Sequence, residues 1–428
     1  MKNSKVSAIV QPRRSVTFLV VCLALTASAT RAGEWTRLRG PNGQGISDAK
    51  TIPVKWTQED YNWKVKLPGT GHSSPVTWRD KVFVTCWDKE KKTGILLALG
   101  ASNGEKLWQK EYALKSFRIN RRNSYAAATP TVDSDRVYVL WPTADDVLLE
   151  ALNHDGEGVW ERHFEGVKSQ HGPGCSPIVA EDMVVFAHER SNREKNAKSA
   201  WIAVDRTTGV TRWVLEREKS DKISYSTPCL YRPDYGGPEL VFTSFAHGLT
   251  GVDPGNGKVI WEAKSALIAR VVSSPVIAGD ALIGTCGQAS SGKRLIAIRP
   301  QKKDNSIVPA EAYRIDGNTT PYVPTSLAHG GLLFTFHDQG YVSCLRGDSG
   351  EQLWREKPAG RYYGSPVWVD GKIYCITIEG DVVVLKAAPE YELLAVNPLG
   401  ETSHATPAVA GGKMYLRTLS QLFCIGGE

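Results

Sequence analysis

Histidine and tyrosine recur at equivalent places along this 428-residue chain, and such side chains are well suited to contacting a ligand. The places are marked by eight prolines, because the third residue before each proline falls at the same point of a repeat. Four of these eight positions carry His72, Tyr225, Tyr363 and His404, and close by in the sequence stand Tyr125, Arg270 and Tyr322. Imidazoles, phenols and a guanidinium offer stacking faces and hydrogen-bond donors. We therefore expect a site for a polar ligand, such as a saccharide or a peptide.

A second candidate site is the loop 116–125, which carries Arg118, Arg121 and Arg122 and no acidic residue. Guanidinium groups bind carboxylate or phosphate through two parallel hydrogen bonds. The loop is therefore a candidate anion-binding loop. The alternative is a solvated loop whose arginines pair with Asp or Glu of a neighbouring segment.

Motifs of the common enzyme classes are missing from the chain. It contains no HExxH, no GxSxG and no phosphate-binding glycine loop. The adjacent pairs His188-Glu189 and His337-Asp338 fall in expected hairpins, where neighbouring side chains point to opposite faces, and this disfavours a shared metal. We therefore assign no catalytic residue and no metal site, and we expect binding rather than catalysis.

The prolines that mark the candidate positions recur at steps of 41 to 55 residues, the period of a propeller, a solenoid or an array. They are Pro75, Pro130, Pro177, Pro228, Pro275, Pro324, Pro366 and Pro407. Each proline, usually preceded by Ser or Thr, opens a strand. A polar turn, two apolar strands and a last strand with an aromatic residue follow in most repeats. Four short strands per repeat predict a four-stranded antiparallel blade. Two repeats depart from the pattern in the turn before the last strand: one has a long insertion over 302–311, and another has residues 388–391 in place of a glycine turn.

The last strands of the repeats are offset from the prolines. They centre on Trp63, Trp108, Trp160, Trp213, Trp261, Tyr313, Trp354 and Leu393, a series that begins before the first proline and ends before the last. Pairing the strand 62–66 with the incomplete last repeat, 405–425, leaves no blade open. The sequence therefore predicts an all-β fold, an eight-bladed β-propeller closed by an N-terminal strand. Its eight equivalent positions would ring one mouth of a central channel, where their side chains either bind a ligand or only fill the channel.

The first 32 residues have the pattern of a signal peptide. A basic start is followed by an apolar stretch, 16–27, that is too short to span a bilayer, and then by small residues. We expect a signal peptide over 1–32, an N-terminal extension over 33–61 and the propeller over 62–428. Cleavage would lower the formal charge from +7 to +2, which disfavours nucleic acid as a partner. We expect a monomeric periplasmic or secreted protein with no membrane span and no lipid anchor.

A structural motif links the repeats to a known family. The spacing Ala-x-Asp-x-x-x-Gly-x-x-x-Trp, seen at Ala203, Asp205, Gly209 and Trp213, resembles the tryptophan docking repeat of quinoprotein dehydrogenases. Parts of it recur at Trp108, at Asp253, Gly257 and Trp261, and at Gly350 and Trp354. We expect Asp to accept turn N–H groups, Gly to supply a positive φ, and Trp to pack between blades. With the opening motif Arg-Gly-Pro-Asn-Gly-Gln-Gly at 39–45, the chain is similar to exported PQQ-like repeat propellers of planctomycetes and to the outer-membrane β-barrel assembly propeller.

The resemblance leaves three functions open. Quinoprotein dehydrogenases carry an adjacent Cys-Cys disulfide over the quinone and a Glu/Asn/Asp set that holds calcium. No two cysteines are adjacent here, and no segment matches the metal set. We therefore expect no cofactor, and we favour a non-catalytic binding or scaffold propeller that recognises a polar ligand or a protein partner at the channel mouth or the blade edges. A PQQ-dependent oxidoreductase and a carbohydrate-binding or carbohydrate-active propeller are the alternatives.

Overall fold

The computed structural model describes residues 34–115, 119–169, 171–172, 174–192, 194, 198–288 and 291–427. The expected signal peptide, 1–32, lies outside them, as does Arg118. Residues 32–428 form one compact unit. In the part of the chain that is described, no helix has the length and apolar character needed to cross a membrane.

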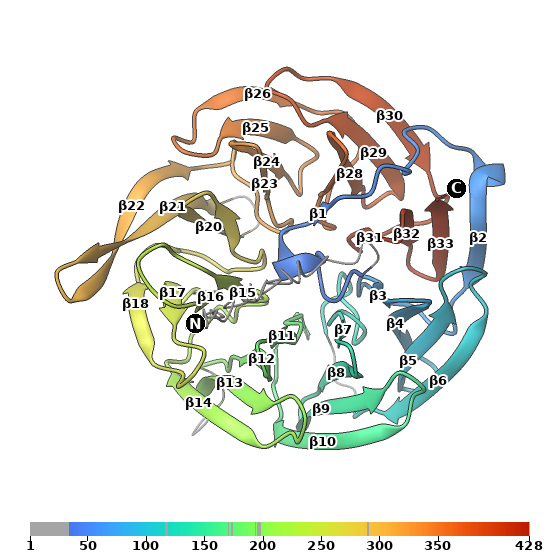
Figure 1. The fold of residues 1–428 in the computed structure, drawn as a ribbon, viewed down its shortest axis with the longest axis horizontal. Coiled ribbons are helices and arrows are strands. Elements are labelled where there is room, and N and C mark those ends of the chain that lie inside the picture. Colours follow the sequence, from blue (N-terminus) through green and yellow to red (C-terminus); the bar gives the residue numbers. More distant parts are fainter. Residues whose placement is uncertain are drawn as a thin grey trace, which may run out of the picture. The chain divides into compact units, whose positions relative to one another are not determined.

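The strands of this unit form eight sheets arranged in a ring (Figure 1). The first two blades are β3 (Val76–Trp78), β4 (Lys81–Asp88), β5 (Thr93–Gly100), β6 (Lys106–Ala113) and β7 (Thr131–Val132), β8 (Arg136–Pro142), β9 (Asp146–Asn153), β10 (Gly158–Glu165). The next two are β11 (Ile178–Ala180), β12 (Met183–His188), β13 (Ser199–Asp205), β14 (Thr211–Arg217) and β15 (Cys229–Tyr231), β16 (Glu239–Ser244), β17 (Gly248–Val252), β18 (Val259–Ala263).

The remaining four blades follow the same order from the channel outward. The fifth and sixth are β19 (Val276–Ala278), β20 (Ala281–Gln288), β21 (Ser291–Lys303), β22 (Ser306–Asp316) and β23 (Leu327–His329), β24 (Leu332–Phe336), β25 (Val342–Arg346), β26 (Gln352–Glu356). The seventh is β27 (Val367–Val369), β28 (Lys372–Ile376), β29 (Asp381–Lys386), β30 (Leu393–Pro398), and the eighth is β31 (Ala408–Ala410), β32 (Lys413–Arg417), β33 (Gln421–Gly426) with β2 (Tyr61–Lys66). Two 3₁₀ turns, η1 (Pro41–Gly43) and η2 (Gln58–Asp60), and the short β1 (Ile46–Ser47) precede β2.

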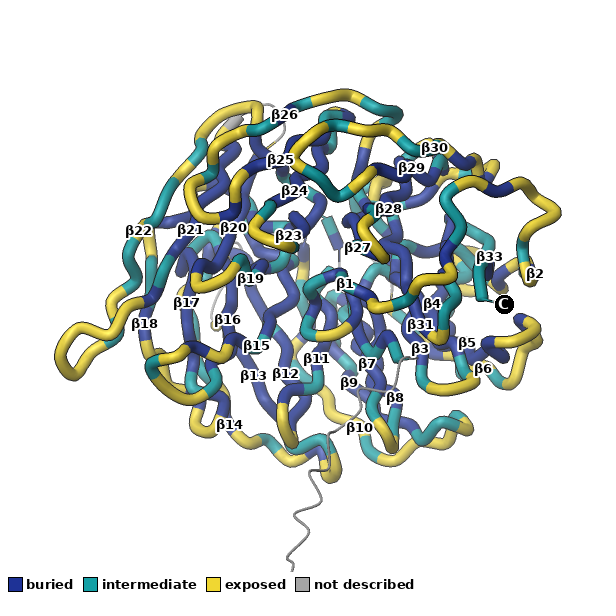
Figure 2. Tube along the Cα trace, turned by 45° about the horizontal axis from the view of Figure 1, so that its top comes forward, coloured by how far each residue is buried: buried dark blue, intermediate teal, exposed yellow. Residues whose placement is uncertain are grey.

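The ring closes as the offset of the two strand series predicts. β2 pairs antiparallel with β33, so that Trp63 lies opposite Cys424 and Lys66 opposite Gln421. The predicted insertion is an extension of β21 and β22, which project beyond the fifth blade as a hairpin (Figure 1). Figure 2 shows the inner strands buried and the tip of this hairpin exposed. We call its outer part, residues 300–309, the arm.

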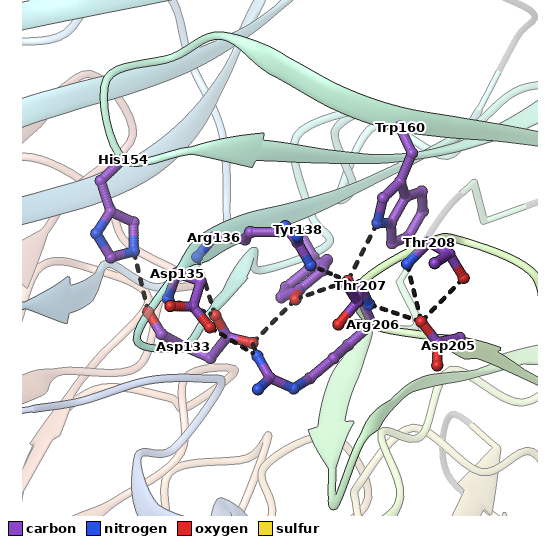
Figure 3. A network of polar contacts seen from close by, with 10 residues as sticks. All are labelled: Asp133, Asp135, Arg136, Tyr138, His154, Trp160, Asp205, Arg206, Thr207 and Thr208. Carbon is purple, nitrogen blue, oxygen red and sulfur yellow. Dashed lines mark hydrogen bonds and ion pairs between the residues drawn. The ribbon is translucent and has the colours of Figure 1, made fainter.

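Neighbouring blades are joined by the docking motif, as the junction of the second and third blades shows (Figure 3). The Trp160 indole N–H donates to the Arg206 carbonyl over 3.1 Å, and the Asp205 carboxylate accepts the Thr208 backbone N–H over 2.8 Å. Gly209 has φ 72°, and a Cβ atom there would lie 2.7 Å from the Trp160 ring. The Arg206 guanidinium also reaches Asp133 of the second blade over 2.9 Å. Glycine is therefore required both by the turn and by the ring that packs on it.

The same junction is found at five other blade boundaries. Aromatic donors reach turn carbonyls of the following blade in five further pairs: Trp63 to Ala101, Trp108 to His154, Trp213 to Pro254, Tyr313 to Gly347 and Trp354 to Ala388. Gly257 packs on Trp213, and Gly350 packs on Tyr313. Asp253 accepts the Gly255 N–H over 2.7 Å. Trp261 of the fourth blade differs, because the fifth blade beside it has the long hairpin in place of a glycine turn. The Trp261 indole instead donates to Glu239 of the fourth blade over 2.6 Å.

A closed circle of hydrogen bonds runs around the channel at the start of the innermost strands. At each of eight positions a backbone N–H donates to the hydroxyl oxygen of the next blade, over 2.9 to 3.2 Å. The hydroxyls belong to Ser74, Thr129, Ser176, Thr227, Ser274, Thr325, Ser365 and Thr406. We call these residues the hydroxyl ring. Seven of the eight are buried, so each N–H would lack a partner without its hydroxyl.

The channel is filled on one side by the N-terminal segment 35–47, which we call the plug (blue, centre of Figure 1). Its backbone continues the sheets, since Thr77 and Val132 donate to the carbonyls of Trp35 and Thr36, and β1 pairs parallel with β27. The side-chain amide of Asn42 both donates to and accepts from Leu230, over 2.7 and 2.8 Å. The plug thus occupies inner strand edges that would otherwise be exposed.

Arg39 is the centre of the plug and is 1% exposed. Its guanidinium donates to five carbonyl oxygens, those of Gly43, Gln44, Thr325, Ser326 and Pro366, over 2.8 to 3.2 Å. Burial lowers the pKa of Arg39 to about 9. Gly40 precedes η1 at φ 64°, and a Cβ atom there would lie 2.4 Å from the Trp35 ring. The opening motif of the chain therefore folds as a channel plug.

The hydroxyl ring makes Ser365→Ala a test of its contribution to stability. The change leaves the buried Thr325 N–H without its acceptor, and we expect a loss of about 1–3 kcal/mol in the free energy of unfolding. Urea unfolding measures it. Ser365→Thr keeps the hydroxyl and should restore stability, while Ser349→Ala, at an exposed turn, should stay within about 0.5 kcal/mol of wild type. Equal stability of Ser365→Ala and wild type would refute the role of the ring.

The plug predicts a larger effect for Arg39→Met. Five carbonyl oxygens, four of them in buried contacts, lose their donor at once, so we expect a loss of at least about 3 kcal/mol in the free energy of unfolding and a lower melting temperature. Arg121→Met, at an exposed loop position, is the matched control and should melt like wild type. An unchanged melting temperature of Arg39→Met would show that the plug contributes nothing to the fold.

Candidate functional site

A cavity of 280 Å³ opens at the channel mouth beside the hydroxyl ring. Six hydroxyl-ring residues line it, and Leu38 of the plug contributes to its lining. Its wall comes from the residues two positions before the ring, one from each blade: His72, Ala127, Gly174, Tyr225, Val272, Val323, Tyr363 and His404. Every repeat therefore contributes to this one cavity.

The sixth repeat has a register different from the predicted one. Its hydroxyl-ring residue is Thr325, which follows Pro324, whereas in the other seven repeats Ser or Thr precedes the proline. The residue equivalent to His72 is consequently Val323 and not Pro321. The proline marks the strand start only indirectly, because the hydroxyl is what joins the blades.

Six of the seven residues predicted for the channel mouth line the cavity: His72, Tyr225, Arg270, Tyr322, Tyr363 and His404. Tyr125 does not. It is 4% exposed and packs in the core with its ring centroid 4.8 Å from that of Trp87. An apolar neighbour in the first blade holds this tyrosine away from the channel, so we remove it from the candidate set. Ligand binding by the other six stays a prediction.

The arginine loop divides in the same way. Arg122 lines the cavity and is exposed, whereas Arg121 is exposed outside it and Arg118 lies outside the described residues. Asn120 and Asn123 of the same loop also line the cavity, and Asn123 donates to the His171 carbonyl over 2.6 Å. The loop therefore reaches the same site as the channel-mouth residues.

One group of cavity-lining side chains is aromatic. The rings of His72 and His404 stack with centroids 4.2 Å apart, and Tyr363 meets His404 edge-on at 4.8 Å. Burial lowers the pKa of His72 to about 3, with His404 and Arg417 adding to the effect. Burial lowers the pKa of His404 to about 4, while a hydrogen bond with the Arg122 backbone opposes the shift and the charge of Arg122 adds to it. Both imidazoles are therefore neutral at neutral pH and offer a stacking face.

A second group of lining side chains combines phenols with the cation of Arg270. The Tyr225 hydroxyl hydrogen-bonds Ser169 over 2.6 Å, and burial raises the pKa of Tyr225. Burial likewise raises the pKa of Tyr322, while a hydrogen bond from Arg270 opposes the shift. The Nε atom of Arg270 is buried and has no hydrogen-bond partner. These side chains present hydrogen-bond donors and positive charge to the cavity.

The donor set does not fit a metal-bound quinone. Hard cations such as calcium take carboxylate and carbonyl oxygens, and no Asp or Glu is among the described residues that line the cavity. Across the described chain no group of three or more His, Cys, Asp or Glu could hold a metal ion. The seven cysteines 86, 175, 229, 286, 344, 375 and 424 are free thiols, so no disulfide covers the cavity.

The sequence prediction did not include the hydroxyl-ring residues in the site. Ser or Thr before the prolines is a visible signal, since it recurs in seven repeats. The strand pattern alone explains it as the start of a strand.

A family model described as outer membrane protein assembly factor BamB matches residues 92–335 and 338–424. The chain belongs to this family. The PQQ-like repeat resemblance drawn from the docking motif is thus confirmed. No curated protein matches the chain.

Solved structures share the fold of this BamB-family chain at low identity. Quinohemoprotein alcohol dehydrogenase from Comamonas testosteroni is 12% identical, with a TM-score of 0.66 over 94% of this chain and 81% of that one. BamB from Moraxella catarrhalis is 12% identical, with a TM-score of 0.57 over 85% and 98%. A europium-containing methanol dehydrogenase is 10% identical, with a TM-score of 0.55 over 93% and 99%. These likenesses establish the eight-bladed fold and leave the function open between dehydrogenases and an assembly factor.

The buried histidines predict acid sensitivity. In the unfolded chain a histidine has a pKa near 6.5. Because the folded pKa values are lower, stability present above about pH 6.5 is lost as the pH falls toward about 4. In urea unfolding, the free energy of unfolding should fall between about pH 7 and pH 5 in both proteins. We expect this fall to be about 2 kcal/mol smaller in His404→Gln than in wild type. The exposed His163, whose pKa is raised by Asp146, provides the control His163→Gln, which should not lessen the loss. The same loss in His404→Gln and wild type would contradict the neutral buried imidazole.

Proposed function

We propose that this protein is a non-catalytic binding propeller that captures a small polar ligand in the central cavity. The observation that carries the proposal is the cavity itself, since all eight repeats contribute to one recess lined by hydroxyls, phenols, imidazoles and guanidinium groups. A volume of 280 Å³ is near the lower end of ligand pockets, about 300 Å³. This size suits a ligand no larger than a monosaccharide or a short peptide end.

The side chains favour binding over catalysis. Glycoside hydrolysis uses two carboxyl groups, and none lies in the described cavity lining. A quinone-dependent dehydrogenase would need metal ligands that this lining does not supply. The hydroxyl ring and the plug also hold the cavity walls in hydrogen-bonded positions, which lowers the entropy cost of binding.

An exported location fits this proposal. The pattern of residues 1–32 is that expected of a signal peptide, and the family description names an outer membrane protein assembly factor. We infer that the chain works in the periplasm or outside the cell as a monomer.

A scaffold role with a protein partner is the second candidate, and one feature of this chain favours it. The arm projects from the fifth blade (Figure 1), and it carries Lys302, Lys303 and the exposed Val308. Pro300 pairs with Pro309 in the arm, so its strand edges are poor templates for sheet addition. A partner would therefore contact its side chains, in agreement with the assembly role that the family description states.

Thermal stability tests the proposed function. We expect at least one compound from a panel of hexoses, uronic acids, sugar phosphates and dipeptides to raise the melting temperature of wild type. The rise should vanish in Val272→Trp, which fills the cavity from its wall, provided that this variant alone melts cooperatively. If no panel member stabilises wild type, or if the rise persists in both Val272→Trp and Ala127→Leu, the cavity is not the binding site. Dye reduction by alcohols or aldoses that depends on added PQQ and calcium would replace binding with dehydrogenase function.

A further inference from the structure

The cavity carries positive charge that the described residues around it do not neutralise. Arg122 and Arg270 both line it, and its described lining contains no Asp or Glu. The buried Nε of Arg270 has no hydrogen-bond partner. A buried guanidinium N–H without an acceptor is costly, and an oxyanion is its natural complement.

Two acidic side chains behind the cavity wall do not supply the missing negative charge. Asp338, which acts on Tyr322, forms an ion pair with the buried Lys293 over 2.8 Å. Glu189, which acts on Tyr225, is buried, and this burial raises its pKa. One carboxylate is therefore already paired, and the other is shifted toward its neutral form.

The two guanidinium groups act on a common neighbour. Burial lowers the pKa of His171, and the charges of Arg270 and Arg122 add to the effect in that order. His171 lines the cavity together with both arginines. Both charges thus act on one lining side chain, although one arginine precedes the second blade and the other the fifth.

We propose that the ligand carries a carboxylate or a phosphate group, bound by Arg122 and Arg270, with its uncharged part against Tyr363, His404 and His72. The charged group would lie where the guanidinium donors converge, and the stacked imidazoles and the phenol would contact a polar ring or chain. This inference rests on the proposed function, because it specifies the class of ligand for the same cavity.

Three probes that share one ring separate charge from shape: glucose, glucuronate and glucose 6-phosphate. Inorganic phosphate alone is a fourth probe. In isothermal titration calorimetry with wild-type protein, we expect glucuronate or glucose 6-phosphate to bind at least about tenfold more tightly than glucose, since bidentate contacts to an ionised group are roughly twice as strong as neutral ones. The tighter of the two identifies carboxylate or phosphate as the preferred group. Added sodium chloride should weaken this binding and leave glucose binding unchanged.

Arginine variants locate the contact. Arg270→Met and Arg122→Met should each lower affinity for the preferred anion by about tenfold or more, and by a larger factor than they lower affinity for glucose. Arg121→Met, from the same loop but outside the cavity, should bind like wild type. Melting temperatures measured first confirm that the variants are folded, and Arg270→Lys serves if Arg270→Met is not, with partial loss of anion preference expected.

The outcomes distinguish the two levels of the proposal. If glucose binds as tightly as the anions and Val272→Trp abolishes the binding, the oxyanion inference is wrong and the binding function stands. The same holds if Arg270→Met and Arg122→Met both keep the anion preference. If none of the four probes binds wild-type protein at millimolar concentration, the oxyanion inference fails for these ligand classes. Separately, a neutral dipeptide that stabilises wild type but not Val272→Trp would still support the cavity.

Discussion

The structure depends on the hydrogen bonds of the hydroxyl ring, in which each blade donates a backbone N–H to the next. Neighbouring blades otherwise meet through apolar side chains and the docking motif near the outer strands. At the channel, inner strands of only two or three residues diverge from a narrow centre. The hydroxyls fix the spacing there, and because the chain of bonds is circular, each residue both donates and accepts. The positions of the cavity-wall residues, two places before each hydroxyl, follow from this circle.

The plug and the cavity are two solutions to the same geometric problem. Eight blades leave a channel that their own side chains do not fill, so inner strand edges and wall residues would meet water. On one side the plug supplies carbonyl, amide and guanidinium partners, with Arg39 joining the sixth and seventh blades. On the other side the mouth keeps open space, and Arg270 keeps an unpartnered Nε. The guanidinium of Arg39 therefore has acceptors in the plug, whereas the Nε of Arg270 at the mouth has none.

The fold could be predicted from the sequence because propeller repeats are local. The periodic prolines predict the number of blades. The position of Trp63 before the first proline predicts the closure of the ring by the pairing of β2 with β33. The candidate site was predicted in part, since His72, Tyr225, Tyr363 and His404 occupy repeat positions. Tyr125 was expected near the channel mouth but lies outside the cavity lining, because side-chain direction in a loop is not periodic. Its ring packs against Trp87 instead. The plug could not be predicted, because the partners of Arg39 are carbonyl oxygens, which any sequence offers.

The closure of the ring also determines the order in which the protein can fold. Arg39 donates to the carbonyl of Pro366, 327 residues later, and β2 pairs with the last strand of the chain. A segment that leaves the ribosome first therefore waits for partners that are made last. Contacts of such long sequence separation make folding slow, so the incomplete chain stays without a closed ring throughout synthesis. The final structure therefore depends on the arrival of the C-terminal strand, which both completes the eighth blade and closes the ring.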